Sequence, residues 1–225
     1  MKKIGVVLSF LVALSASAFA LNAEAPAVKN CSDKKAAFEK QVNAMDKDSF
    51  IVQYVVINLA DNFPAADEEA APLAQCYATY YVKGKLMTQY MRENADIFRG
   101  EAVEMAKSYG EATVRDVTRV YDDLQQEILD FAGRVEALNE KVAFDEMAKQ
   151  DNDYFIAQNI LINLADPFAT LTDKEAVSKA KVYGKFKVKG EPMLSFVEKQ
   201  AREHAELGRE GLDAFAPRVA ALAAQ

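Results

Sequence analysis

Apolar residues recur at alternating steps of three and four along one stretch in the middle of the chain. The series comprises Val114, Val117, Tyr121, Leu124, Ile128, Phe131, Val135, Leu138 and Val142. This spacing is the a/d pattern of a helix with a continuous apolar seam, and no proline interrupts it. We predict one helix over residues 111–150, about 60 Å long at ~1.5 Å per residue, which is long enough to bridge two bodies. Gly133 falls at an outward f position of the heptad, where it costs ~1 kcal/mol relative to alanine.

The segments on the two sides of this helix contain the same sequence pattern. The run Ile-Asn-Leu-Ala-Asp occurs at residues 57–61 and again at residues 162–166. Other residues recur at the same offset of 105 or 106 positions, including the pairs Asp48 and Asp153, Phe50 and Phe155, Tyr77 and Tyr183, Lys83 and Lys189, and Gly84 and Gly190. The period exceeds that of common solenoids, so we predict an all-α fold of two tandem, duplicated bundles of about four helices each. Repeat 1 covers residues 32–119 and repeat 2 covers residues 138–225, and the long helix is shared by both.

Turn and capping residues predict the helices inside each repeat. In repeat 1 we expect helices over residues 32–45, 49–61, 67–83 and 86–107. Gly84 is a suitable C′ residue for the third of these helices. The helix over 49–61 is apolar nearly all round, which predicts that it is buried. In repeat 2, Thr172 and Glu175 form a capping box, and Pro217 is expected to open the last helix.

The N-terminus has the pattern of a secretory signal peptide of bacterial style. Lys2 and Lys3 precede an apolar run, and small residues lead to a cleavage point after Ala20. The run is too short for a membrane anchor, which is the weaker alternative. We predict a signal peptide over residues 1–20, a flexible lead-in over residues 21–31, a periplasmic or secreted location, and no membrane anchor after cleavage.

Composition and motifs exclude several classes of function. The net charge of −7 argues against nucleic acid or anionic lipid as a partner, and the 51% apolar content argues against a disordered chain. The sequence contains no metal-binding, phosphate-binding or nucleophile motif, so we expect no catalytic residues, no metal and no cofactor. His204 is the single histidine. Its acidic neighbours Glu203 and Glu206 do not face it on a helix, so we interpret His204 as a packing residue.

The repeated asparagine and aspartate are the most specific polar residues of the two repeats. Asn58 lies on the same helical stripe as Ile51, Tyr54 and Val55, so we expect the asparagines of both repeats to be buried and hydrogen-bonded. One interpretation is structural, with each asparagine paired to a neighbouring helix and each aspartate shaping the next turn. The other is a polar ligand pocket in each repeat, formed by the residues Asn58, Asp61 and Tyr77 and by Asn163, Asp166 and Tyr183.

Aromatic residues lie close to lysines near the end of the third helix of repeat 1. Tyr77, Tyr80 and Tyr81 precede Lys83 and Lys85. Such residues can stack on a ligand or on exposed groups of a partner. The structural alternative is packing inside the bundle, with the hydroxyl groups at its rim.

Cys31 and Cys76 are the only two cysteines, and in an exported protein we expect them to form a disulfide. Their counterparts in repeat 2 are Ala137 and Val182, which are apolar positions that a bundle buries. The bridge closes a loop from Ser32 to Gln75, for which chain entropy gives ~4 kcal/mol of stabilisation. The alternative is a pair of buried free thiols.

These observations lead to two hypotheses for the function. The first is a non-enzymatic binding, adaptor or chaperone-like protein with two similar surfaces, because a duplicated helical body lacks a recognisable catalytic set. The second is a small-ligand-binding bundle with one pocket per repeat around Asn58 and Asn163. A protein partner is expected in the first case. A homodimer is expected if the seam between Leu124 and Phe131 is left uncovered.

Overall fold

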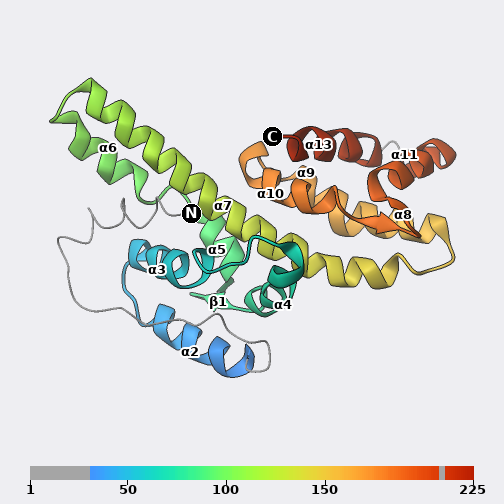
Figure 1. The fold of residues 1–225 in the computed structure, drawn as a ribbon, viewed down its shortest axis with the longest axis horizontal. Coiled ribbons are helices and arrows are strands. Elements are labelled where there is room, and N and C mark those ends of the chain that lie inside the picture. Colours follow the sequence, from blue (N-terminus) through green and yellow to red (C-terminus); the bar gives the residue numbers. More distant parts are fainter. Residues whose placement is uncertain (1–30, 208–210) are drawn as a thin grey trace. The chain divides into compact units, whose positions relative to one another are not determined.

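The computed structural model describes residues 31–207 and 211–225 (Figure 1), so the predicted signal peptide and most of the lead-in lie outside the described residues. The described chain is mostly helical, which confirms the all-α class. It divides into two compact units, up to Leu129 and from Asp130 onward. The predicted long helix is present as α7 (Glu111–Met147), with 37 residues, and it contributes to both units.

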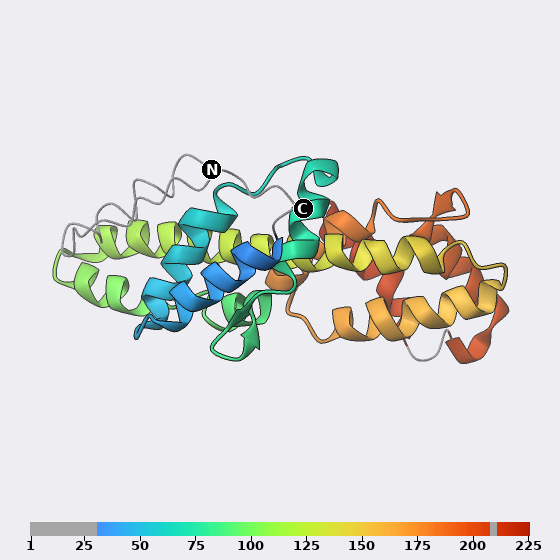
Figure 2. The ribbon, with the colours of Figure 1, turned by 90° about the horizontal axis from the view of Figure 1, so that it is seen from below.

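Unit 1 is built from short helices, one hairpin and the first part of α7. Its elements are α2 (Cys31–Asn43), α3 (Asp48–Val55), the π-helix η2 (Val56–Ala60), α4 (Asp67–Tyr77), β1 (Tyr81–Val82), β2 (Lys85–Leu86), α5 (Met87–Glu93) and α6 (Arg99–Lys107). The first part of α7 lies beside α6 in both views (Figure 1 and Figure 2). The Nε atom of Arg99 is 3.2 Å from a carboxylate oxygen of Asp122, which connects these two helices.

Unit 2 contains the second part of α7 and a similar series of elements. They are α8 (Asp153–Ile160), the π-helix η3 (Leu161–Ala165), α9 (Asp166–Ala169), α10 (Asp173–Tyr183), β3 (Lys187–Val188), β4 (Glu191–Pro192), α11 (Met193–Glu203), α12 (Ala205–Leu207) and α13 (Asp213–Ala223). Helix α13 packs on α10 and α11, and α11 also contacts α8. The predicted capping box of Thr172 and Glu175 is present at the start of α10.

The predicted helices over residues 67–83 and 86–107 are each wrong in part, because a β-hairpin lies between them. Helix α4 ends at Tyr77, and β1 pairs antiparallel with β2. Lys83 and Gly84 have φ values of 48° and 80°, so both central residues of the turn are left-handed, as a type I′ turn requires. Gly84 therefore serves a hairpin rather than a helix end. The remaining segment forms two helices, α5 and α6, rather than one.

The same hairpin occurs in unit 2, and a salt bridge accompanies each of the two turns. Lys189 and Gly190 have φ values of 49° and 90°. The ammonium group of Lys83 is 2.7 Å from a carboxylate oxygen of Asp48, and that of Lys189 is 2.7 Å from Asp153. Each pair joins a hairpin to the first residue of α3 or α8.

Two sequence-based expectations for single residues of unit 2 are wrong. Pro217 does not open the last helix, because α13 begins at Asp213 and continues through the proline. The ring removes only the one N–H that would bond to the first turn. Gly133 is buried rather than outward-facing, and a Cβ atom there would lie 3.4 Å from Cβ of Ser178 and 3.5 Å from the carbonyl oxygen of Glu175. A side chain longer than that of alanine would therefore meet α10.

The apolar seam of α7 is buried over its middle part. Leu124, Ile128 and Phe131 are all buried, whereas Val142 near the end is exposed. The exposed apolar centre that would favour a dimer through the seam is therefore absent from these residues.

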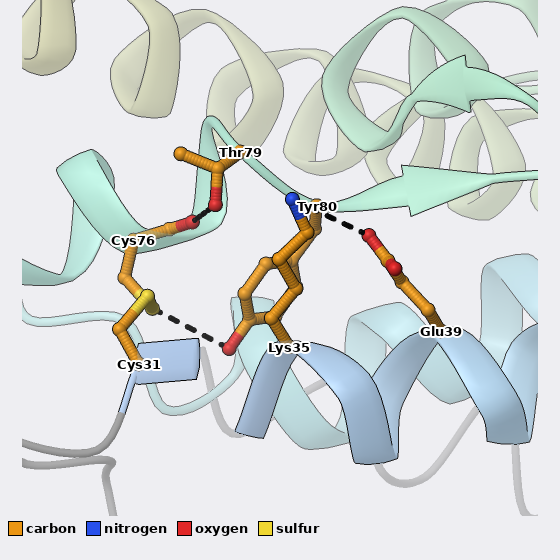
Figure 3. Close-up of a disulfide and its surroundings, with 6 residues drawn as sticks. All are labelled: Cys31, Lys35, Glu39, Cys76, Thr79 and Tyr80. Carbon is orange, nitrogen blue, oxygen red and sulfur yellow. Dashed lines mark hydrogen bonds and ion pairs between the residues drawn. A yellow bond between two sulfur atoms is a disulfide. The ribbon is translucent and has the colours of Figure 1, made fainter. Parts of the chain in front are cut away.

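The predicted disulfide is present and joins α2 to α4 (Figure 3). Cys31 is the first residue of α2, and its Cα atom is 5.8 Å from that of Cys76. The hydroxyl group of Thr79 donates to the carbonyl oxygen of Cys76 at 2.8 Å, and the hydroxyl oxygen of Tyr80 lies 3.5 Å from the sulfur of Cys76. The bridge thus connects the N-terminal end of α2 to the last turn of α4.

We expect the double variant Cys31→Ser, Cys76→Ser to lose about 2–4 kcal/mol of free energy of unfolding, because the bridge no longer restricts the unfolded chain. The two cysteines are 45 positions apart. Thermal unfolding followed by circular dichroism, with and without a reductant, measures this loss. The reductant should lower the midpoint of the parent chain and leave that of the double variant unchanged. Two free thiols in the unreduced protein would contradict the prediction.

We expect Gly133→Ala to raise the free energy of unfolding by up to ~1 kcal/mol, because the new Cβ atom makes ordinary contacts and alanine favours the helix. Gly133→Leu should lower it by about 1–3 kcal/mol, because the longer side chain meets α10. Gly100 is the control, since nothing lies within 4 Å of a Cβ atom built there. Urea unfolding measures the alanine and leucine variants at both positions. Equal tolerance of leucine at positions 133 and 100 would refute the close approach.

Candidate functional site

The two asparagines of the repeated run have different surroundings. Asn58 is 9% exposed, whereas Asn163 is exposed to solvent, so the prediction that both are buried is wrong for Asn163. Each lies in a π-helical segment, and its Nδ2 donates to a backbone carbonyl one turn earlier. Asn58 donates to Tyr54 at 2.8 Å, and Asn163 donates to Asn159 at 3.0 Å. These bonds differ from the predicted pairing with a neighbouring helix, because each amide group donates to its own helix.

The aspartate and the tyrosine that we predicted beside each asparagine differ in burial. Asp61 and Asp166 are exposed, and Asp166 is the first residue of α9. Tyr77 and Tyr183 are buried in the cores of their units. The asparagine, aspartate and tyrosine of a repeat therefore do not form one polar wall, and the symmetrical pocket of the second hypothesis is not the arrangement observed.

Unit 2 instead contains a buried charged cluster that the sequence analysis missed. Lys179 on α10 is only 5% exposed. Its Nζ lies 2.8 Å from a carboxylate oxygen of Glu140 and 3.1 Å from one of Glu136, both on α7. The hydroxyl group of Tyr183 donates to the other carboxylate oxygen of Glu140. We call these four residues the α7–α10 cluster.

The α7–α10 cluster combines two carboxylates with one ammonium group and one hydroxyl group. The pKa of Tyr183 lies well above its usual value, first because the side chain is buried and then because of the charge and hydrogen bond of Glu140. Tyr183 therefore keeps its proton and donates to Glu140.

A half-open pocket of about 380 Å³ lies next to this cluster, between the second part of α7 and the helix formed by α8 and η3. Its lining residues are Asn139, Glu140, Ala143, Phe144, Met147, Asn159, Asn163 and Leu164. The volume falls in the range of small-molecule sites, roughly 300–1,000 Å³. Of the predicted site residues, Asn163 lines this pocket directly, and Tyr183 reaches it through Glu140.

A second candidate surface is a pair of exposed apolar residues on each unit. Phe50 and Ile57 are 47% and 41% exposed, and Phe155 and Ile162 are 45% and 56% exposed. Each pair lies on one continuous helical segment, which runs from α3 into η2 in unit 1 and from α8 into η3 in unit 2. We call them stripe 1 (Phe50, Ile57) and stripe 2 (Phe155, Ile162). The prediction that the helix over 49–61 is buried all round is thus wrong on one face.

The remaining candidates are structural or lie at the surface. Tyr80 is buried, which raises its pKa to about 12, whereas Tyr81 is exposed beneath the ammonium group of Lys35 at 5.3 Å from the ring centroid. Lys83 and Lys85 form salt bridges with Asp48 and Glu93. His204 packs edge-on against the ring of Tyr154, with the centroids 4.9 Å apart.

The described residues contain neither a metal-binding cluster nor a membrane-spanning helix. Among residues 31–207 and 211–225, no group of three or more histidine, cysteine, aspartate or glutamate side chains is placed to hold a metal ion. In the same part of the chain, none of the helices has the length and apolar character needed to cross a bilayer. Comparison of the chain with protein families, with curated proteins and with solved structures gives no match.

We expect Tyr183→Phe to lower the free energy of unfolding by about 1–2 kcal/mol at neutral pH, because Glu140 loses a donor. Above about pH 10, Tyr183 ionises in the unfolded chain but not in the folded one, so stability falls as the pH rises. Tyr183→Phe removes this contribution, which is at most about 1.4 kcal/mol per pH unit.

Urea unfolding between about pH 8 and pH 11 measures the effect, and stability should fall less steeply with pH in Tyr183→Phe than in the parent chain. Tyr109→Phe is the control, because Tyr109 is exposed. Identical slopes for the parent chain and Tyr183→Phe would show that this proton is not held by the fold.

Proposed function

We propose that this protein is a non-enzymatic, exported helical binding protein, an adaptor or chaperone-like module, that offers two similar apolar surfaces to a protein partner. The observation that carries the proposal is the presence of stripe 1 and stripe 2 at matching positions of the two units. A single exposed apolar residue is ordinary on a protein surface, but two matched pairs on corresponding helices need an explanation.

The same proposal includes a tandem duplication of the helical unit. The hairpin turns Lys83–Gly84 and Lys189–Gly190 have nearly the same φ values. The salt bridges Lys83–Asp48 and Lys189–Asp153 have the same length. The π-helices η2 and η3 also fall on the two copies of the repeated run. These local matches support a common ancestor for the units and hence two related binding surfaces.

We place the protein in the periplasm or outside the cell. The disulfide supports this location, because such bonds persist in oxidising compartments. The N-terminal pattern of two lysines, an apolar run and small residues supports export from a bacterial cell. In this setting the partner is another exported protein or a segment of one.

A small-ligand site in unit 2 is the second candidate function. The pocket beside the α7–α10 cluster favours it, since eight side chains from two helices line a cavity of suitable volume. The site would belong to unit 2, because the α7–α10 cluster depends on Lys179, whose counterpart in the repeat is the buried Leu73.

Site-specific photo-crosslinking in intact cells tests the leading proposal. A benzophenone amino acid replaces Phe50 or Phe155 in the stripes, or Lys149 as a control on an exposed polar face. We expect discrete adducts from positions 50 and 155, identified by mass spectrometry as the same partner, and none from position 149. An adduct of two copies of this chain would assign the stripes to self-association. Equal, diffuse labelling from all three positions would overturn the proposal.

A further inference from the structure

The lining of the unit 2 pocket combines polar and apolar side chains and contains no cationic one. Its polar lining consists of three amide side chains and one carboxylate, with no cationic side chain among the lining residues. Its apolar lining includes Phe144 and Leu164, which are buried, and Met147, which is half-buried. A ligand that fits both parts has a polar head and an apolar body.

The two amide groups on the α8 and η3 side present their oxygen atoms. The Nδ2 of Asn159 donates to the carbonyl of Phe155 at 2.9 Å, and that of Asn163 donates to the carbonyl of Asn159 at 3.0 Å. A backbone carbonyl only accepts hydrogen bonds, so the nitrogen of each amide must be the atom that points toward it. The Oδ1 of Asn159 also accepts from Nδ2 of Asn163 at 3.4 Å and keeps a second lone pair. Both Oδ1 atoms can therefore accept a hydrogen bond from a ligand that donates.

The negative charge of the pocket lining favours a positively charged ligand. Glu140 is the one charged side chain among the lining residues, and it belongs to the α7–α10 cluster. The pKa of Tyr183 is raised, so its hydroxyl group adds no further charge. The chain as a whole is also negative, with a formal charge of −7. A cation near a partly buried carboxylate gains more than it would in water.

From these three observations we infer that the pocket of unit 2 binds a small primary ammonium compound with an apolar body. The ammonium group donates to the oxygen atoms of Asn159 and Asn163 and lies near the carboxylate of Glu140, and the body rests on Phe144 and Leu164. The inference rests on the second candidate function, because it names the ligand class of that pocket.

Calorimetric titration of the purified full chain with three amphiphiles of equal chain length tests the inference. Octylamine carries an ammonium group, octanol a neutral hydroxyl group and octanoate a carboxylate. We expect octylamine to bind about tenfold or more tightly than either of the others, because charge-assisted hydrogen bonds exceed neutral ones.

Paired variants show whether the pocket is the site. Ala143→Trp fills the pocket and should abolish binding of octylamine, whereas Val142→Trp, at an exposed neighbour outside the lining, should not. Asn163→Leu removes an acceptor and should weaken binding about tenfold, whereas Gln158→Leu on the same helix should leave it unchanged. Circular dichroism of each variant verifies the fold.

The possible results separate the ligand class from the pocket itself. If octanol or octanoate binds as tightly as octylamine and Ala143→Trp abolishes that binding, the pocket is a ligand site and the ammonium inference is wrong. If none of the three binds, or if binding is the same in Ala143→Trp and Val142→Trp, the small-ligand function of the pocket is overturned as well.

Discussion

The attachment of the first helix of each unit to the helix before its hairpin is the constraint on which the rest of each unit depends. In unit 1 this attachment is covalent, through Cys31 on α2 and Cys76 on α4. In the duplication proposed above, the corresponding helices of unit 2 are α7 and α10, and the salt bridges of Lys179 join them. The positions that correspond to the cysteines are occupied by Ala137 and Val182, both buried. Two different interactions thus serve the same junction.

These two interactions have different physical consequences. A disulfide acts largely by restricting the unfolded chain, and it does not require a polar interior. A buried ion pair carries a desolvation cost, so it stabilises the fold little on its own. Removing one partner destabilises the fold far more than replacing both partners by apolar residues, because the remaining charge is left buried. The α7–α10 cluster therefore stabilises the contact between the two helices less than an apolar interface would. Its Glu140 also lines the pocket of unit 2.

The sequence was sufficient for features that depend on periodicity or on residue type, and insufficient where one signal has two structural meanings. The seam of α7, the disulfide and the capping box at Thr172 are of the first kind. Gly84 is of the second kind, because a left-handed glycine ends a helix as readily as it completes a type I′ turn. Gly133 was misplaced because the heptad describes one seam, whereas α7 also packs a second face on α10.

The candidate site depended on contacts that the sequence does not encode locally. Lys179 and Glu140 are 39 positions apart, so their pairing follows from how α10 lies on α7 rather than from spacing. The stripes were missed for another reason. Phe50, Ile57, Phe155 and Ile162 are apolar, and apolar character alone does not distinguish a core position from a surface that binds a partner. The repeated asparagines were predicted to be buried and to pair with a neighbouring helix, but each bonds to its own helix, and Asn163 is exposed.

The position of the disulfide near the N-terminus also affects which part of the chain can be cross-linked first. Both cysteines precede α7 in the sequence. A chain that enters an oxidising compartment from its N-terminus presents both thiols before the long helix has emerged. In the exported protein proposed above, the bridge between α2 and α4 can then form while the rest of the polypeptide is still in transit. Unit 2 has no such early closure. Its first helix is the second part of α7, and Lys179 follows α7 in the sequence.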